Sequence, residues 1–195
     1  VRHLGRVVRD YRSGPRLKGQ VRALRHLRLP HLRRRFRQPG QVWAVTVVRD
    51  ELDVLPSTIR HLIDQGIDHI LVADNLSSDG TRQWLTEAAA QDPRLHLALD
   101  ANPAHDQSAK MTLLAHHAWR AGADWIIPFD ADEFWFARGA TLGALLRATS
   151  ANVVYADFIH MVPTTPAPKD LFGAEYVMDT QPAFPGKVAF RSHPL

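Results

Sequence analysis

Residues 125–135 read WIIPFDADEFW. An apolar run ends there in two carboxylates, Asp130 and Asp132, and Glu133 follows directly. A buried strand that ends in this way brings carboxylate oxygens to the edge of a sheet, where α/β proteins bind their ligands. Mg²⁺ and Mn²⁺ prefer such oxygens, and a Mg²⁺ ion is commonly shared between carboxylates and the phosphates of a substrate. The stretch therefore predicts a site for a metal ion and a nucleotide.

Around this stretch the sequence alternates between short apolar runs and amphipathic segments. Before it, strands are expected at 42–48, 67–73 and 94–99, and helices at 52–65, 78–91 and 107–121. Strands separated by helices of this length indicate βαβ units and a parallel sheet that helices cover on both faces. After residue 140 the pattern predicts a helix at 141–149, a strand at 152–161, a loop at 163–168 and a strand at 187–191.

Basic residues gather in the N-terminal segment. The first 40 residues hold 13 of the 24 Lys and Arg residues but one of the 20 acidic residues, so the rest of the chain is acidic. Apolar residues at helical spacing, among them Leu17, Val21 and Leu27, predict two short amphipathic helices here. Such an arm fits a membrane surface or another polyanion, and it equally fits packing on the body or on a second copy. Pro39–Gly40 is the expected boundary.

The chain has no cysteine, which excludes a disulfide framework and a thiolate metal site. No apolar run approaches the ~20 residues that span a bilayer. We expect a cytoplasmic protein that makes peripheral contact with the inner face of the plasma membrane through residues 1–37.

Polar residues follow three of the predicted strands. The first strand is followed by RDE at 49–51, the second by DNLSSDGT at 74–81, and the fourth by DADE at 130–133. Because the carboxyl ends of parallel strands meet at one edge of a sheet, these loops are expected to converge on one crevice. Asp and Asn are also common turn formers, so the convergence of three loops indicates function more strongly than any single loop does.

The segments VTVVRDE at 45–51, DNLSSDGT at 74–81 and DADEF at 130–134 resemble glycosyltransferase family 2, and in particular its branch with a DxDEF motif. The resemblance runs from about residue 42 to about 160. It implies a GT-A fold, a three-layer α/β sandwich with a mostly parallel central sheet, preceded here by the basic helical arm. The chain would then divide into a basic extension, 1–40, and a GT-A domain, 41–195. That domain would comprise a nucleotide-binding half over about 41–136 and part of an acceptor half over about 137–195.

The resemblance also implies roles for individual residues. Six would contact the nucleotide sugar: Asp50, Glu51, Asp74, Asn75, Lys110 and Asp130. Asp132 would ligate the metal, Asp130 would contact the ribose or the metal and its water, and His193 is a further candidate ligand. Many members have Asp-Asp where this chain has Asp74–Asn75, so either residue is a candidate for binding the base of the nucleotide. Lys110 is either a diphosphate contact or an exposed helix lysine.

The implied reaction moves a sugar from a nucleotide-diphosphate sugar, with a UDP-sugar favoured, to a hydroxyl of a saccharide or lipid-linked acceptor. Mn²⁺ or Mg²⁺ would offset the charge that develops on the leaving diphosphate. Inversion by direct displacement needs a base that takes the acceptor proton. No motif places this base, and the candidates are Glu133, Asp157 and Asp179, with Asp170 and Glu175 also in range. Trp135 and Phe136 either fill the core or line the sugar pocket.

Rival interpretations remain. A phosphatase of the haloacid dehalogenase type also ends a strand with Asp-x-Asp, but its motif usually opens the chain, whereas here it follows the fourth strand. A non-catalytic module that binds sugar nucleotides or a membrane stays open because the base is unplaced. Nucleic acid is disfavoured as a partner, because the arm offers only Tyr11 and Phe36 for stacking and the body is acidic.

Overall fold

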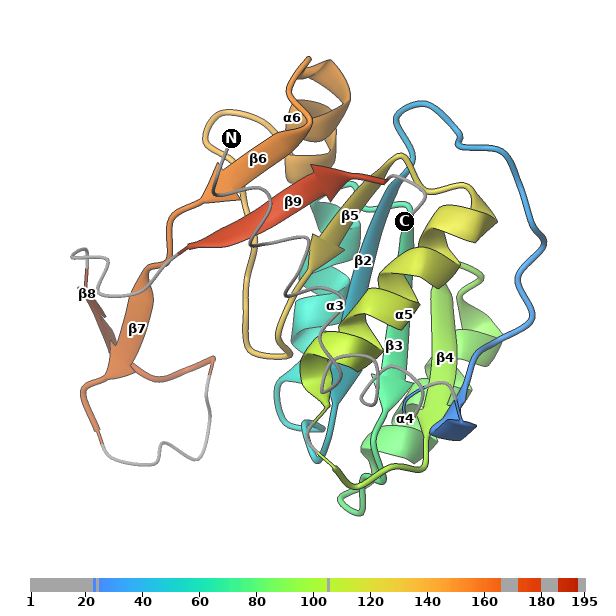
Figure 1. Ribbon diagram of the computed structural model, residues 1–195. Coiled ribbons are helices and arrows are strands. Elements are labelled where there is room, and N and C mark those ends of the chain that lie inside the picture. The colour runs from blue at the N-terminus through green and yellow to red at the C-terminus, as the bar shows by residue number, and fades with distance from the viewer. Residues whose placement is uncertain (1–22, 24, 105, 166–171, 180–185, 193–195) are drawn as a thin grey trace, which may run out of the picture.

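The computed structural model describes residues 23, 25–104, 106–165, 172–179 and 186–192. It contains a seven-stranded mixed sheet, helices on both faces of that sheet, and a separate two-stranded ribbon (Figure 1). The strands of the large sheet, in spatial order, are β1 (Leu27–Arg28), β4 (Leu95–Asp100), β3 (His69–Asp74), β2 (Val42–Val48), β5 (Trp125–Pro128), β9 (Lys187–Arg191) and β6 (Val153–Ala156). The helices are α3 (Leu55–Asp64), α4 (Thr81–Gln91), α5 (Gln107–Ala121) and α6 (Leu142–Ala148).

The centre of the sheet is parallel, as the sequence predicts. Strand β2 pairs in parallel with β3 and β5, and β3 pairs in parallel with β4. Strand β9 runs antiparallel to both β5 and β6, and the short β1 closes the other edge antiparallel to β4. The carboxyl ends of β2, β3, β4 and β5 therefore lie at one edge, which is the lower edge in Figure 1.

Side chains of each strand alternate between the two faces of the sheet, and each face has its own core. Along β2, Val42 and Ala44 pack in the core beneath α3, α4 and α6. Trp43 and Val45 pack in the opposite core, which α5 covers. Both faces are thus apolar, which is why the strands read as nearly continuous apolar runs in the sequence.

Several elements differ in their bounds from the sequence prediction; α4 begins at Thr81 and β3 covers His69–Asp74. The helix expected from residue 52 begins at Leu55, because the Glu51 carbonyl accepts hydrogen bonds from the N–H groups of Val54 and Leu55 and closes a turn first. The strand expected over 152–161 is two strands in different sheets, β6 and β7 (His160–Pro163). Strand β7 forms the ribbon with β8 (Tyr176–Asp179), which the sequence did not predict. The helix expected at 141–149 and the strand at 187–191 are both present.

Only part of the basic arm is described. The first expected helix lies outside the described residues, and the second prediction is wrong at its end, where Leu27 lies in β1. Residues 29–38 then run past α5 (Figure 1). Arg35 N–H donates to the Arg120 carbonyl at 2.9 Å and Gln38 N–H to the Gly122 carbonyl at 2.8 Å. In the described part of the arm, packing on the body is therefore what the structure supports. No helix among the described residues combines the length and apolar character that crossing a bilayer requires.

Candidate functional site

A cavity of about 360 Å³ lies at the carboxyl ends of β2, β3 and β5. Its lining comes from all three loops that the sequence singled out and from the first turns of α5. The principal polar lining residues are Arg49, Glu51, Asn75, Gln107, Lys110, Asp130 and Asp132. The structure thus gathers four of the predicted nucleotide-sugar residues, together with Asp132, around one space.

The loop after β5 is held in place by two helical side chains. Thr58 Oγ1 on α3 donates to the Ala131 carbonyl at 2.5 Å. His61 Nε2, also on α3, lies 2.7 Å from the Trp135 carbonyl, so this nitrogen carries the hydrogen in that contact. These bonds fix the backbone on both sides of Asp132 and Glu133.

The carboxylates of this loop have different surroundings. Asp130 Oδ2 accepts from Lys187 Nζ at 2.7 Å, and its Oδ1 accepts from Gln107 Nε2 at 3.3 Å. Glu133 is buried; its Oε2 accepts from the Asp130 backbone N–H at 3.0 Å, and its Oε1 lies 2.9 Å from Lys187 Nζ. Asp132 is exposed and makes no hydrogen bond or ion pair with the described part of the chain. Its oxygens are therefore free for a ligand.

Negative charge exceeds positive charge around the cavity. Burial raises the pKa of Glu51 above its usual value, and the charge of Asp132 raises it further, followed by smaller effects of other carboxylates that include Asp130. A raised carboxyl pKa reports that one more negative charge is unfavourable at this place. A cation would relieve that repulsion.

The acidic residues fit a divalent ion that completes its shell elsewhere. The described residues contain no group of three or more His, Asp or Glu side chains arranged to hold a metal. Asp132, with Asp130 beside it, would instead supply one or two oxygens, leaving the remaining positions to water and phosphate. That is the usual arrangement for Mg²⁺ at nucleotide sites. His193, the other predicted ligand, lies outside the described residues.

Asp50 joins two loops. It has a left-handed backbone with φ of 56°. Its Oδ1 accepts from Ser78 N–H at 2.6 Å and from Asp79 N–H at 3.3 Å. Asp79 in turn accepts from Leu52 N–H at 3.0 Å. The Asp50 carboxylate therefore braces the loop after β3 against the loop after β2 and is absent from the cavity lining given by the described residues.

Asp74 and Asn75 are adjacent at the end of β3, but their side chains have different surroundings. Asp74 is fully buried, and its Oδ2 accepts from Arg82 Nε at 2.7 Å and Nη2 at 2.6 Å. Its Oδ1 is buried without a hydrogen-bond partner among the described residues. Asn75 lines the cavity and donates from Nδ2 to Asp100 Oδ2 at 2.7 Å and to the Asn102 carbonyl at 2.7 Å.

The expectation that Lys110 is an exposed helix lysine is wrong. Its side chain is 2% exposed, and its ammonium lies 2.6 Å from Asp100 Oδ2. It also donates to the carbonyls of Asn102 at 3.1 Å and Ala104 at 2.8 Å. With these acceptors its donors are occupied, so Lys110 stabilises the wall of the cavity.

The candidate bases are spread over the molecule. Glu133 has both oxygens engaged in the loop. Asp157 and Glu175 are exposed, and Asp179 ends β8 in the ribbon, paired in register with His160. Asp170 lies outside the described residues. None of the described candidates lines the cavity, and the identity of the base stays a prediction.

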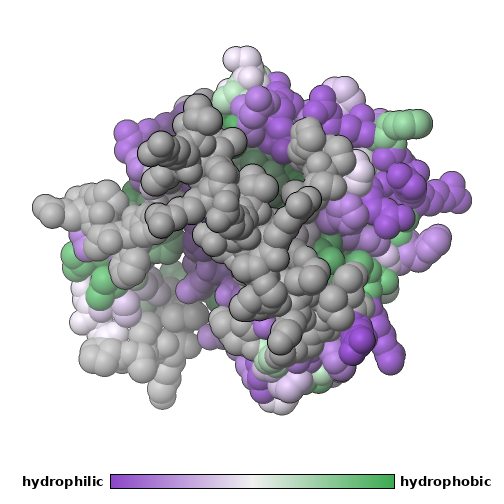
Figure 2. All heavy atoms as spheres, viewed as in Figure 1, coloured by the Kyte–Doolittle hydropathy of each residue, from purple (hydrophilic) through white to green (hydrophobic). Residues whose placement is uncertain are grey.

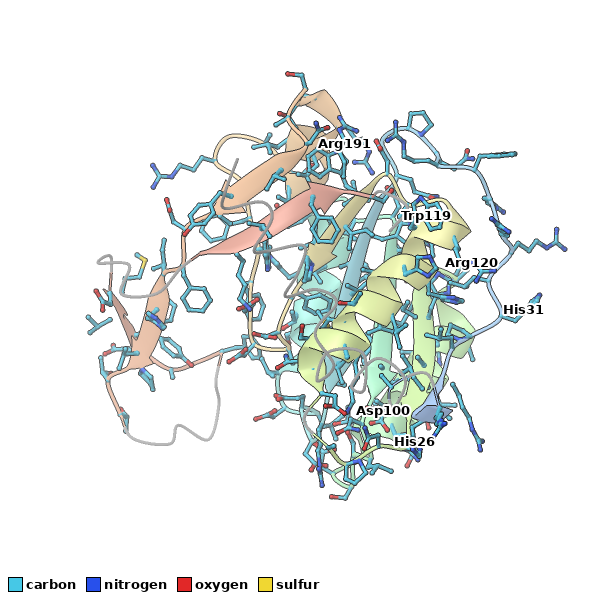
Figure 3. All side chains as sticks on the ribbon, in the orientation of Figure 1. His26, His31, Asp100, Trp119, Arg120 and Arg191 are labelled. Atoms are coloured by element: carbon cyan, nitrogen blue, oxygen red, sulfur yellow. The ribbon has the colours of Figure 1, made fainter. Side chains whose placement is uncertain are left out.

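Aromatic residues after the loop divide between core and surface. Trp135 is buried in the core beneath α3, whereas Phe136 is exposed and neither lines the cavity. Residues that the sequence analysis missed are Gln107, Lys187 and Asp100. Asp100, labelled at the lower edge of the sheet in Figure 3, directly follows a predicted strand, so the strand-end rule applied to 94–99 could have found it. Nothing in the sequence around Lys187 indicates that its side chain contacts the loop after β5.

Comparison with known proteins identifies the family of the chain. A family model described as glycosyl transferase family 2 matches residues 43–159. The mannosyltransferase PcManGT from Pyrobaculum calidifontis, solved in complex with GDP-Man and Mn²⁺, aligns with a TM-score of 0.50 and 19% identity over 74% of this chain and 44% of its own. The crystal structure of S. aureus TarS 1–349 gives a TM-score of 0.41 and 12% identity over 48% of this chain and 28% of its own. The chain thus spans less than half the length of these solved chains. No curated protein matches it.

Proposed function

Because the chain belongs to glycosyl transferase family 2, we propose that it transfers a sugar from a nucleotide-diphosphate sugar to an acceptor hydroxyl with the help of a divalent cation. The family match covers more than half of the chain, and the mostly parallel sheet has the GT-A arrangement. The observation that carries the proposal is the meeting of three strand-end loops around one acidic cavity in which Asp132 is unengaged.

The proposed metal site consists of Asp132 and Asp130. Bound Mn²⁺ or Mg²⁺ would neutralise charge on the leaving diphosphate. Asp132 offers free oxygens, and Thr58 and His61 fix the backbone that carries them. The raised pKa of Glu51 supports a site that favours positive charge. The mannosyltransferase with a related fold is described as a complex with Mn²⁺, which makes this ion the first to test.

The base of the nucleotide would meet Asp74 and Asn75. The buried Asp74 Oδ1 lacks a donor among the described residues, and a buried acceptor of this kind is normally satisfied. Uracil and guanine each carry a ring N–H that could supply the missing hydrogen bond after a movement of the loop that follows β3, because Asp74 is fully buried and does not line the cavity. Asn75 lines the cavity and can meet the base directly. We favour a UDP-sugar as donor and test GDP beside it, because the mannosyltransferase neighbour holds GDP-Man.

We propose that the transfer is an inverting displacement. The residue that takes the proton from the acceptor hydroxyl is not identified. Glu133 is the weaker candidate, because Lys187 and the Asp130 backbone N–H already occupy its oxygens. Asp157 and Asp179 remain. The phosphatase alternative, with Asp130 as the nucleophile, instead predicts phosphate-ester hydrolysis that Asp130→Asn abolishes.

The acceptor is proposed to be a saccharide or a lipid-linked saccharide. Apolar side chains of the β7–β8 ribbon support the lipid-linked form: Met161, Val162, Val177 and Met178 are each more than half exposed. Figure 2 shows apolar residues at the side of the molecule where this ribbon lies.

We also propose that the arm binds an anionic membrane, namely the inner face of the plasma membrane. Phe36 is 94% exposed and is flanked by exposed arginines at 33–35 and 37. An exposed aromatic ring among arginines suits the headgroup region of a bilayer. Sedimentation with vesicles of phosphatidylserine and phosphatidylcholine, compared with phosphatidylcholine alone, tests this. Equal sedimentation with both would count against it.

The central experiment is a sugar-nucleotide hydrolysis screen with and without Mn²⁺. We expect release of nucleoside diphosphate that requires the ion and falls at least ~100-fold in Asp132→Asn, because one metal ligand is lost while the loop backbone is unchanged. Asp53→Asn is the matched control, since Asp53 is an exposed carboxylate on the neighbouring loop that does not line the cavity. Metal-independent release that is equal in both variants would contradict the proposal.

A further inference from the structure

Lys187 connects the last described strand to the acidic loop after β5. It is the first residue of β9, which lies between β5 and β6 in the sheet. Its ammonium lies 2.7 Å from Asp130 Oδ2 and 2.9 Å from Glu133 Oε1. A residue 57 positions away in the chain therefore places a cation on the first carboxylate of the predicted metal loop.

Two other cations, Lys110 and Arg49, lie at the cavity. The ammonium of Lys110 is buried against Asp100 and two backbone carbonyls. Arg49 lines the cavity from the loop after β2, and its guanidinium lies 3.8 Å from Asp50. Among the described residues, Lys187 is thus the cation that contacts the Asp130–Glu133 loop itself, against the charges of Asp130, Asp132 and Glu133.

The ammonium of Lys187 has donor capacity left. A lysine ammonium has three N–H donors, and the two carboxylates take two of them. The side chain is 35% exposed, so the third donor is open to a ligand. The ammonium is a compact positive charge beside Asp130, which lines the cavity, and such a charge suits a phosphate oxygen.

We propose that Lys187 is a donor-binding residue that holds Asp130 and Glu133 in position before the donor arrives and then shares its third donor with a diphosphate oxygen. The inference rests on the proposed function, because it takes a nucleoside diphosphate as the ligand. It adds a residue from the acceptor half to a site that the three strand-end loops otherwise form. In this arrangement, β9 couples the two halves of the domain through one ammonium group.

Two effects of opposite sign distinguish this role from a purely structural one. With no nucleotide present, the ammonium repels a metal ion that approaches Asp130 and Asp132. With nucleotide present, the same ammonium attracts the diphosphate. Loss of the charge should therefore tighten the binding of Mn²⁺ alone and weaken the binding of nucleoside diphosphate at saturating Mn²⁺. A brace that only supports the loop would weaken both.

The test compares Lys187→Gln, Lys187→Arg and the wild type. We expect Lys187→Gln to bind free Mn²⁺ a few-fold more tightly by electron paramagnetic resonance, and UDP or GDP roughly tenfold more weakly by calorimetry, as one unit charge at short range predicts. Lys187→Arg should retain most of the nucleotide affinity because it keeps the charge. Arg147→Gln is the matched control: the Arg147–Asp68 pair has the same 2.7 Å separation and similar exposure but lies away from the cavity.

A second measurement uses the wild-type protein, so it remains valid even if a Lys187 variant fails to fold. Acetylation of Lys187, followed by mass spectrometry, should be suppressed by UDP with Mn²⁺ and unaffected by uridine with Mn²⁺. If UDP leaves the acetylation unchanged, or if Lys187→Gln behaves like Arg147→Gln, the inference is wrong while the proposed function stands. If the wild type binds neither UDP nor GDP with Mn²⁺, the proposed function fails and the inference with it.

Discussion

Asn75 donates a hydrogen bond from its side-chain amide to the Asp100 carboxylate at 2.7 Å, and this bond joins the loops after β3 and β4 beside the cavity. The same Asp100 oxygen lies 2.6 Å from the ammonium of Lys110 on α5. All three side chains are buried. Three successive elements of the nucleotide-binding half are therefore fastened by one carboxylate, which fixes the cavity wall independently of any ligand.

Replacement of Lys110 by Met should destabilise the protein strongly. Within the described part of the chain, the variant leaves the buried Asp100 charge with the Asn75 amide and the backbone N–H of Asn102 as its donors. Loss of one partner of a buried ion pair typically costs about 3–5 kcal/mol. Urea unfolding of Lys110→Met should show a loss of this size.

The control for Lys110→Met is the double variant with Asp100→Asn. Removing the second charge should restore part of the lost free energy of unfolding, because no uncompensated ion remains. A single variant as stable as the wild type, or a double variant with the sum of two independent losses, would show that the pair is not coupled as described.

Thr58 is expected to control the loop that carries Asp132. Thr58→Val keeps the shape of the side chain and removes the hydroxyl that donates to the Ala131 carbonyl at 2.5 Å. A buried acceptor that loses its donor costs about 1–2 kcal/mol of unfolding free energy. Because the freed carbonyl lies between Asp130 and Asp132, we also expect a few-fold weaker affinity for UDP with Mn²⁺.

Thr86→Val provides the comparison for Thr58→Val. The Thr86 hydroxyl donates to a carbonyl of its own helix, α4, and is exposed. Its loss should change neither stability by more than ~0.5 kcal/mol nor the affinity for nucleotide. Equal effects of the two substitutions would remove the special role assigned to Thr58.

The sequence predicts the buried elements well because their signals are local. Helix α5 has the predicted bounds, Gln107–Ala121, since its apolar periodicity ends at Gly122, which adopts a left-handed conformation. Strand β2 also matches its prediction. The ribbon of β7 and β8 was missed because both strands are short and exposed, so neither shows the alternation of a half-buried strand.

The same distinction applies to the site. Asp130, Asp132 and Asn75 were found because each lies in a loop that begins at the end of a strand. Lys187 was missed because its contact with Asp130 depends on β9 pairing with β5, which nothing near residue 187 indicates. Lys110 was expected to be exposed or to bind phosphate, and only the tertiary arrangement supplies the buried carboxylate that accepts its charge.

Gly122 is expected to be necessary for the arm to lie on α5. Its φ is 110°, and an added Cβ would lie 3.1 Å from the Phe36 carbonyl oxygen and 3.2 Å from Arg35 Cβ. Gly122→Ala should therefore combine backbone strain with displacement of the arm, at a cost of about 2–3 kcal/mol. Limited trypsin digestion should then cleave faster at the arginines of residues 33–37.

Gly139→Ala separates strain from displacement. Gly139 also has a positive φ, 76°, but an added Cβ would meet nothing within 4 Å. This variant should lose about 1 kcal/mol and leave the rate of trypsin cleavage in the arm unchanged. Faster cleavage in both variants would mean that the contact of the arm with Gly122 is not responsible.

Stability should fall as the pH is lowered from about 6.5 towards 4. Burial lowers the pKa of His96 to about 4, and the neighbouring His69 and His117 add to the effect, with a small opposing effect from Asp92. The unfolded chain, with a histidine pKa of about 6.5, therefore binds more protons in this window, and protonation favours unfolding. After allowance for partial exposure of the ring, His96 should contribute about 1–2 kcal/mol.

His96→Phe keeps the stacking on Trp43 and removes the proton site, so its urea midpoint should fall less with acidification than that of the wild type. Parallel pH profiles of the two proteins would rule this explanation out.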